Sequence, residues 1–137
     1  MKSLKLIFLA ALICSMISCS DEDSEPLDAL VGEWATTSLV ATNCTNSSEN
    51  GTADCGGIPC LNIVIGGDGS YTLSGPAITE TETGKMTATE TTVKLCANNL
   101  TEEECTNQDN NAYTLIDGNL TVVFSEDCTY TAVFQKK

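Results

Sequence analysis

Residues 61–73 read Leu-Asn-Ile-Val-Ile-Gly-Gly-Asp-Gly-Ser-Tyr-Thr-Leu, and this stretch decides the fold class. Leu61, Ile63 and Ile65 lie two positions apart, which places their side chains on one face of a β-strand. The Asp-Gly pair at 68–69 is typical of a tight hairpin turn. Tyr71 then begins the returning strand. The stretch therefore predicts an antiparallel β-hairpin.

The same combination of short strands and turn residues recurs on both sides of this hairpin. Threonine is abundant, and it favours half-exposed strands over helices. We predict about seven or eight short strands and no convincing helix. The strands are expected within 34–42, 61–65, 71–74, 85–95, 113–116, 120–124 and 128–134. This pattern indicates an all-β domain, either a small antiparallel up-and-down barrel or a two-sheet sandwich. Periodicity alone does not separate the two.

The N-terminal residues have the pattern of an export signal. Lys2 and Lys5 precede an apolar run over residues 6–13. This run is too short to span a bilayer and fits the apolar region of a secretory signal peptide. We therefore predict a signal peptide over residues 1–18.

Cys19 stands where such a signal is cleaved, after Met-Ile-Ser at 16–18. This resembles the lipobox of bacterial lipoproteins, which implies acylation of Cys19, by palmitate or a similar chain, and anchoring in the outer membrane of the cell envelope. The alternative is ordinary cleavage that leaves Cys19 a free thiol. Residues 19–28 form an acidic tether, similar to the surface-export signal of Bacteroidetes lipoproteins, or a plain spacer. The folded domain is predicted over 29–137.

The net negative charge of that domain limits the kinds of partner it can bind. All nineteen acidic residues follow position 18, whereas only four of the six lysines do. A strongly acidic domain repels phosphate backbones, so we expect no nucleic-acid partner. The charge favours a cationic partner or simply forms a solvated acidic surface.

Six cysteines follow Cys19, an even number typical of a disulfide framework in a small exported domain. We predict no metal site, because the chain has no histidine and no Cys-x-x-Cys pair. Cys96 and Cys105 flank one short acidic loop and are the predicted local pair; the connectivity of the others is left open. The six are Cys44, Cys55, Cys60, Cys96, Cys105 and Cys128.

Two short motifs in order resemble lipocalins. Gly32 and Trp34 match the G-x-W opening, and Asp-Gly-Ser-Tyr at 68–71 is similar to the D-G-x-Y hairpin of small bacterial lipocalin-like lipoproteins. The resemblance implies that Gly32 and Trp34 form a structural plug at the barrel base. Lipocalins stack an arginine on this tryptophan; the chain has none, and Lys136 is the candidate substitute. A small barrel can be filled by its own side chains, so a ligand cavity does not follow from the resemblance.

The residues do not indicate an enzyme or a cofactor. Without histidine or arginine, Ser-His-Asp, Cys-His and arginine-assisted phosphoryl-transfer sites are excluded. Two functions remain. One is a lipid-anchored surface module that binds a small apolar ligand or a partner protein. The other is a structural or accessory lipoprotein with a filled barrel. An open apolar cavity would favour the first.

Overall fold

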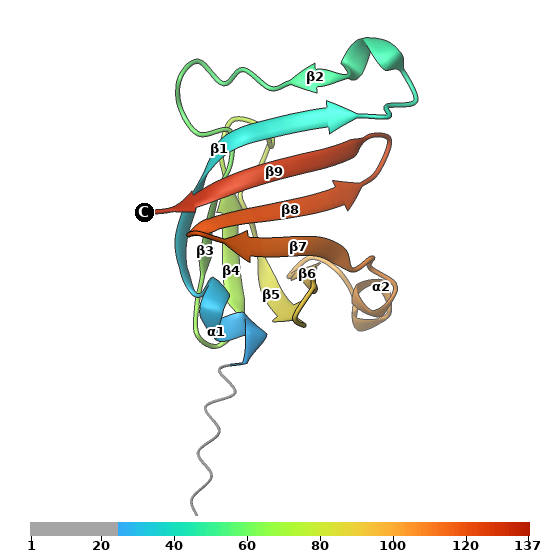
Figure 1. Cartoon of the computed structure of the whole chain (residues 1–137). Helices are drawn as coiled ribbons and strands as arrows, with labels where there is room; N and C mark the ends of the chain where they lie inside the picture. The colour runs from blue at the N-terminus through green and yellow to red at the C-terminus, as the bar shows by residue number, and fades with distance from the viewer. Residues whose placement is uncertain (1–24) are drawn as a thin grey trace, which may run out of the picture.

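The computed structural model of the chain describes residues 25–137, and its strands form one antiparallel sheet (Figure 1). The strands are β1 (Gly32–Thr42), β2 (Gly51–Thr52), β3 (Asn62–Ile65), β4 (Ser70–Ser74), β5 (Glu82–Ala88), β6 (Thr92–Ala97), β7 (Asn111–Ile116), β8 (Asn119–Ser125) and β9 (Thr129–Lys136). From β3 to β9 each strand pairs with its neighbour in sequence, as in an up-and-down meander. The hairpin of residues 61–73 becomes β3 and β4, with Ile65 opposite Tyr71.

Strand β1 closes the sheet into a barrel. One edge of β1 pairs with β9 from Trp34 to Thr42, and the other edge pairs with β3 and then with the short β2. The register with β9 shifts between Thr36 and Ser38, a bulge of the kind that lets a strand bend around a barrel. The predicted barrel is confirmed as a closed ring of eight strands, with β2 outside the ring. The alternative two-sheet sandwich is wrong.

The two ends of the barrel differ. Tight turns join β3 to β4 and β7 to β8 at one end, and Asp117 and Gly118 both have positive φ angles of 51° and 78°, as a type I′ hairpin requires. The longer connections lie at the other end, between β1 and β3, β4 and β5, and β6 and β7. We call these the turn end and the loop end.

The prediction of no helix is wrong for two five-residue segments. Helix α1 (Pro26–Leu30) begins with proline in its first turn, at the turn end beside the start of β1 (Figure 1). Helix α2 (Glu102–Thr106) starts with a capping box, in which Thr101 and Glu104 bind each other's backbone N–H groups. The Thr101 hydrogen bonds also lower the pKa of Glu104. Segments this short show no helical periodicity, so the sequence pattern does not reveal them.

Helix α1 overlaps the predicted tether. Residues 26–28 belong to this helix, and Leu27 packs against the core, although the sequence places the start of the domain at residue 29. The predicted signal peptide and Cys19 lie outside the described residues. Within residues 25–137, no helix has both the length and the apolar character that a transmembrane segment needs.

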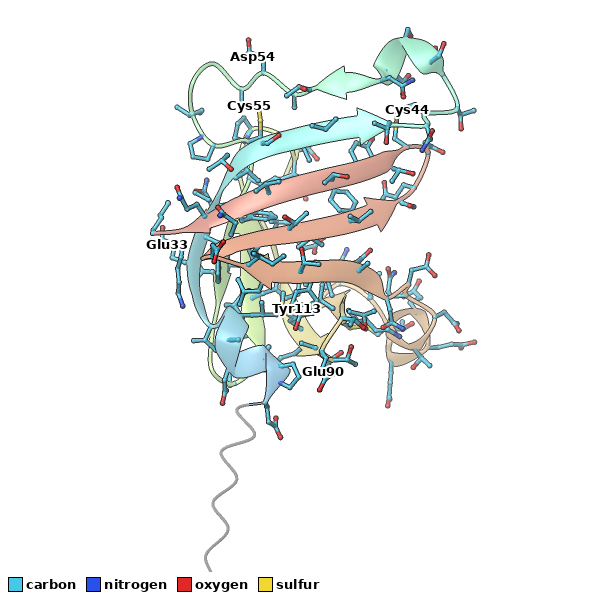
Figure 2. The ribbon with its side chains drawn as sticks, in the orientation of Figure 1. Glu33, Cys44, Asp54, Cys55, Glu90 and Tyr113 are labelled. Atoms are coloured by element: carbon cyan, nitrogen blue, oxygen red, sulfur yellow. A yellow bond between two sulfur atoms is a disulfide. The ribbon has the colours of Figure 1, made fainter. Side chains whose placement is uncertain are left out.

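All six predicted cysteines pair, as Cys44–Cys128, Cys55–Cys60 and Cys96–Cys105. The last pair is the one predicted from the sequence. Figure 2 shows Cys44 just beyond the C-terminal end of β1 and Cys55 in the loop between β2 and β3. Cys128 stands before β9, and Cys105 belongs to α2. The cross-links therefore brace the loop end, where the backbone is least regular.

Candidate functional site

The barrel interior holds a cavity of about 670 Å³, which is lined mainly by apolar side chains. Alternate residues of each strand point inward, as the pleat of a strand requires. The lining side chains come from every strand of the ring and include Leu39, Ile63, Met86, Leu95, Val122 and Phe134. The volume lies within the range of about 300–1,000 Å³ that is usual for small-molecule sites.

The closed end of the cavity is the turn end, where α1 contributes to its lining. Leu30 of α1 is fully buried and contributes to the lining. Trp34 is 1% exposed and does not line the cavity; its indole N–H donates a hydrogen bond of 2.8 Å to the Leu30 carbonyl. The structure therefore places Trp34 in the core, where it joins α1 to the first strand.

Gly32 and Lys136 complete this end of the barrel. Trp34 and Lys136 are opposite each other in the β1–β9 ladder, and the Lys136 ammonium lies 5.3 Å from the centre of the tryptophan ring. A Cβ atom at Gly32 would stand 2.6 Å from Cε of Lys136, and Gly32 has a φ of 136°. The backbone angle is what favours glycine here, because the lysine atoms near this position belong to the flexible end of its side chain and can move. Lys136 therefore lies over the Trp34 ring as a cation, the position for which the sequence suggests it in place of an arginine.

The mouth of the cavity lies at the loop end and is polar. Its rim combines amide, hydroxyl and carboxylate side chains from the β6–β7 and β8–β9 connections and the strand ends beside them, namely Asn99, Gln108, Asp109, Asn111, Ser125 and Glu126. Most of these residues are exposed, so this end of the cavity meets solvent. The disulfide from Cys96 to Cys105 holds α2 against β6, next to the segment that supplies Gln108 and Asp109. This disulfide thus braces one side of the mouth.

One half-buried carboxylate of the cavity lining lies where β5 begins, at the loop end of the barrel. Glu82 is the first residue of β5, and it shares the inward face of that strand with Met86. The Tyr71 hydroxyl donates a hydrogen bond of 2.5 Å to Glu82 Oε1. Tyr71 is 2% exposed, and burial, followed by the hydrogen bond and charge of Glu82, raises the pKa of Tyr71 above its usual range. The buried ring fixes where this carboxylate stands.

Sequence reasoning did not single out Tyr71 or Glu82 as site residues. A signal was present, because counting back by twos from Met86 places residues 84 and 82 on the same face of β5. The hydrogen bond itself depends on the register that sets Leu73 opposite Glu82. No local pattern in the sequence reports that register.

A second tyrosine has the same kind of environment outside the cavity lining. The Tyr113 hydroxyl donates a hydrogen bond of 2.8 Å to the Thr89 carbonyl, which ties β7 to the β5–β6 turn. Burial, and then the negative charge of Glu90, raise the pKa of Tyr113. Figure 2 shows Tyr113 and Glu90 near the same end of the molecule. This contact is structural, because neither residue reaches the cavity.

One group of side chains has the composition of a metal site without its chemistry. The sulfur atoms of Cys44 and Cys128 and a carboxylate oxygen of Glu49 lie within 4.8 Å of one another. The two cysteines are bonded to each other as a disulfide, however. Neither sulfur is then a thiolate, which is the form that binds metal ions.

No protein-family model, no curated protein and no solved structure matches the chain. The structure itself defines the class: a small, closed, antiparallel eight-stranded barrel that is cross-linked by three disulfides and is compatible with a lipocalin-like fold.

Proposed function

We propose that this domain is a lipocalin-like, non-catalytic binding module that holds a small apolar or amphipathic ligand inside its barrel. The observation that carries the proposal is the cavity of about 670 Å³ with an apolar wall and a polar, solvent-facing mouth. A purely structural barrel gains stability by filling such a space, because empty volume forfeits packing contacts. The cavity therefore favours a binding module over a structural lipoprotein with a filled interior.

We propose further that the module is held at the outer membrane by acylation of Cys19. The support is the sequence around this cysteine together with the three disulfides, since disulfides persist in oxidising compartments outside the cytoplasm. Helix α1 lies at the turn end of the barrel, opposite the cavity mouth. An anchor upstream of α1 would hold the turn end nearest the lipid and leave the mouth facing away from it.

A neutral naphthyl dye, N-phenyl-1-naphthylamine, tests the binding function because it brightens when it enters an apolar site. The full chain carrying Cys19→Ala avoids competition from its own acyl chain. Val122 of β8 lines the cavity, whereas its neighbour Val123 is not part of the lining. We expect Val122→Trp to weaken dye binding at least tenfold by occupying the cavity, and Val123→Trp to leave it unchanged.

Circular dichroism and thermal melting must show that both tryptophan variants are folded. Dye binding that is absent in the parent protein, or equal in the two variants, would contradict a ligand site within the barrel. The anchor is tested separately by metabolic labelling with a fatty-acid probe. Labelling that persists in the Cys19→Ala chain would show that Cys19 is not the acylated residue.

A further inference from the structure

We propose that the ligand of the barrel carries a protonated amine, which pairs with the Glu82 carboxylate inside the cavity. This inference rests on the proposed binding function and names the chemical class of the ligand: an apolar body with one ammonium group. The observations behind it are the place of Glu82, the positions of the lysines and the charge of the mouth.

Glu82 is held so that one of its oxygen atoms is available. Among residues 25–137 the Tyr71 hydroxyl is the one group that donates a hydrogen bond to the Glu82 side chain, and it binds Oε1. Oε2 therefore has no donor from the described part of the chain. A cationic donor would stabilise this carboxylate more than a neutral donor, because charge-assisted hydrogen bonds are about twice as strong as neutral ones.

The protein supplies no cation for this carboxylate within the described residues, where every lysine is placed elsewhere. Two lysines form ion pairs on the barrel surface, one binds a backbone carbonyl, and one lies over the tryptophan. These contacts are Lys85 with Asp68 at 2.9 Å, Lys137 with Glu33 at 2.7 Å, Lys94 with the Thr106 carbonyl at 3.1 Å, and Lys136 with the Trp34 ring at 5.3 Å. None of the four lines the cavity. A cation at Glu82 must then arrive with the ligand.

The charge of the mouth also favours a ligand with an ammonium group. Asp109 and Glu126 stand on the rim, and the lining includes no basic side chain. A ligand with a carboxylate head would pass two negative charges and approach a third, whereas an ammonium group is attracted along the same path. A divalent metal ion is a poor alternative, because calcium requires about six to eight oxygen ligands and, within residues 25–137, Glu82 belongs to no cluster of three or more potential metal-ligating side chains.

The test compares three molecules that share one alkyl chain: dodecylamine, 1-dodecanol and dodecanoate. Each competes with the bound naphthyl dye at concentrations below those at which it aggregates. We expect dodecylamine to displace the dye at about ten- to a hundredfold lower concentration than 1-dodecanol, as a charge-assisted hydrogen bond predicts. Dodecanoate should be the weakest competitor.

Two matched variants separate the Glu82 contact from general attraction to an acidic protein. Glu82→Gln should reduce the apparent affinity for dodecylamine about tenfold more than it reduces the affinity for 1-dodecanol, so the preference for the amine over the alcohol should fall about tenfold. Glu80→Gln removes the same charge two residues earlier, outside the cavity lining, and should leave this preference unchanged.

The other outcomes distinguish failure of the ammonium proposal from failure of the binding function. If the dye binds but the three head groups compete equally, or dodecanoate wins, the ammonium proposal is overturned while the binding function stands. Equal losses in the Glu80 and Glu82 variants would also overturn it, by reducing it to surface charge. If the dye does not bind, the binding function itself fails. The head-group comparison uses the parent barrel, so it still tests the preference for an ammonium group if Glu82→Gln does not fold.

Discussion

Replacement of Trp34 by alanine should remove most of the stability of the barrel. The side chain is 1% exposed, and a tryptophan of this kind buries about 200 Å² of largely apolar surface. At about 25 cal/mol/Å², that surface contributes about 5 kcal/mol, close to the roughly 3–5 kcal/mol that truncation of a buried tryptophan commonly costs. The change also leaves the Leu30 carbonyl without its 2.8 Å partner. Since small domains have about 5–15 kcal/mol in total, Trp34→Ala should be unfolded or close to it.

The assay is urea unfolding followed by far-ultraviolet circular dichroism, which does not depend on the tryptophan itself. Trp34→Phe is the matched control, because it keeps a buried ring and removes the indole N–H; it should lose clearly less stability than the alanine variant. In the parent protein, acrylamide should quench the fluorescence of Trp34 poorly. Free quenching by acrylamide, together with an alanine variant that unfolds at the parent urea concentration, would refute the structural role of this residue.

Three further predictions follow from the turn end, the cross-links and the buried hydroxyl. Gly32→Ala should cost about 1–3 kcal/mol in urea unfolding, since alanine must adopt a φ of 136°. Replacing the Cys44–Cys128 pair with serines should cost about 4–5 kcal/mol, against about 2 kcal/mol for the Cys55–Cys60 pair, because the first closes a separation of 84 residues and the second one of 5; equal losses in parallel urea curves would exclude this loop-closure account. Because the pKa of Tyr71 is raised in the folded state above its ordinary value of 10.0, the stability it supplies is complete below pH 10 and is lost at higher pH. The melting temperature should therefore fall less steeply with pH above pH 10 for Tyr71→Phe than for the parent. Identical slopes would contradict a raised pKa of Tyr71 in the folded state.

The sequence by itself determined the local architecture. Period-two apolar positions at 61, 63 and 65 and the Asp-Gly pair at 68–69 specify a hairpin, because strand pleating and turn geometry act over a few residues. The even number of cysteines predicted disulfides, and the short acidic loop between Cys96 and Cys105 identified one pair. The two five-residue helices escaped notice because a single turn leaves no periodic pattern.

Only the tertiary structure decided how the strands close and what they enclose. The pairing of β1 with β9 joins opposite ends of the domain, and its bulge between Thr36 and Ser38 has no signature in the sequence. Whether inward side chains fill a barrel depends on the summed packing of every strand, so the cavity of about 670 Å³ could not be read from any one of them. The hydrogen bond from Tyr71 to Glu82 likewise requires the register between β4 and β5, which is set by the closed sheet. Local periodicity thus specifies the strands, while the non-local pairing among them creates the site.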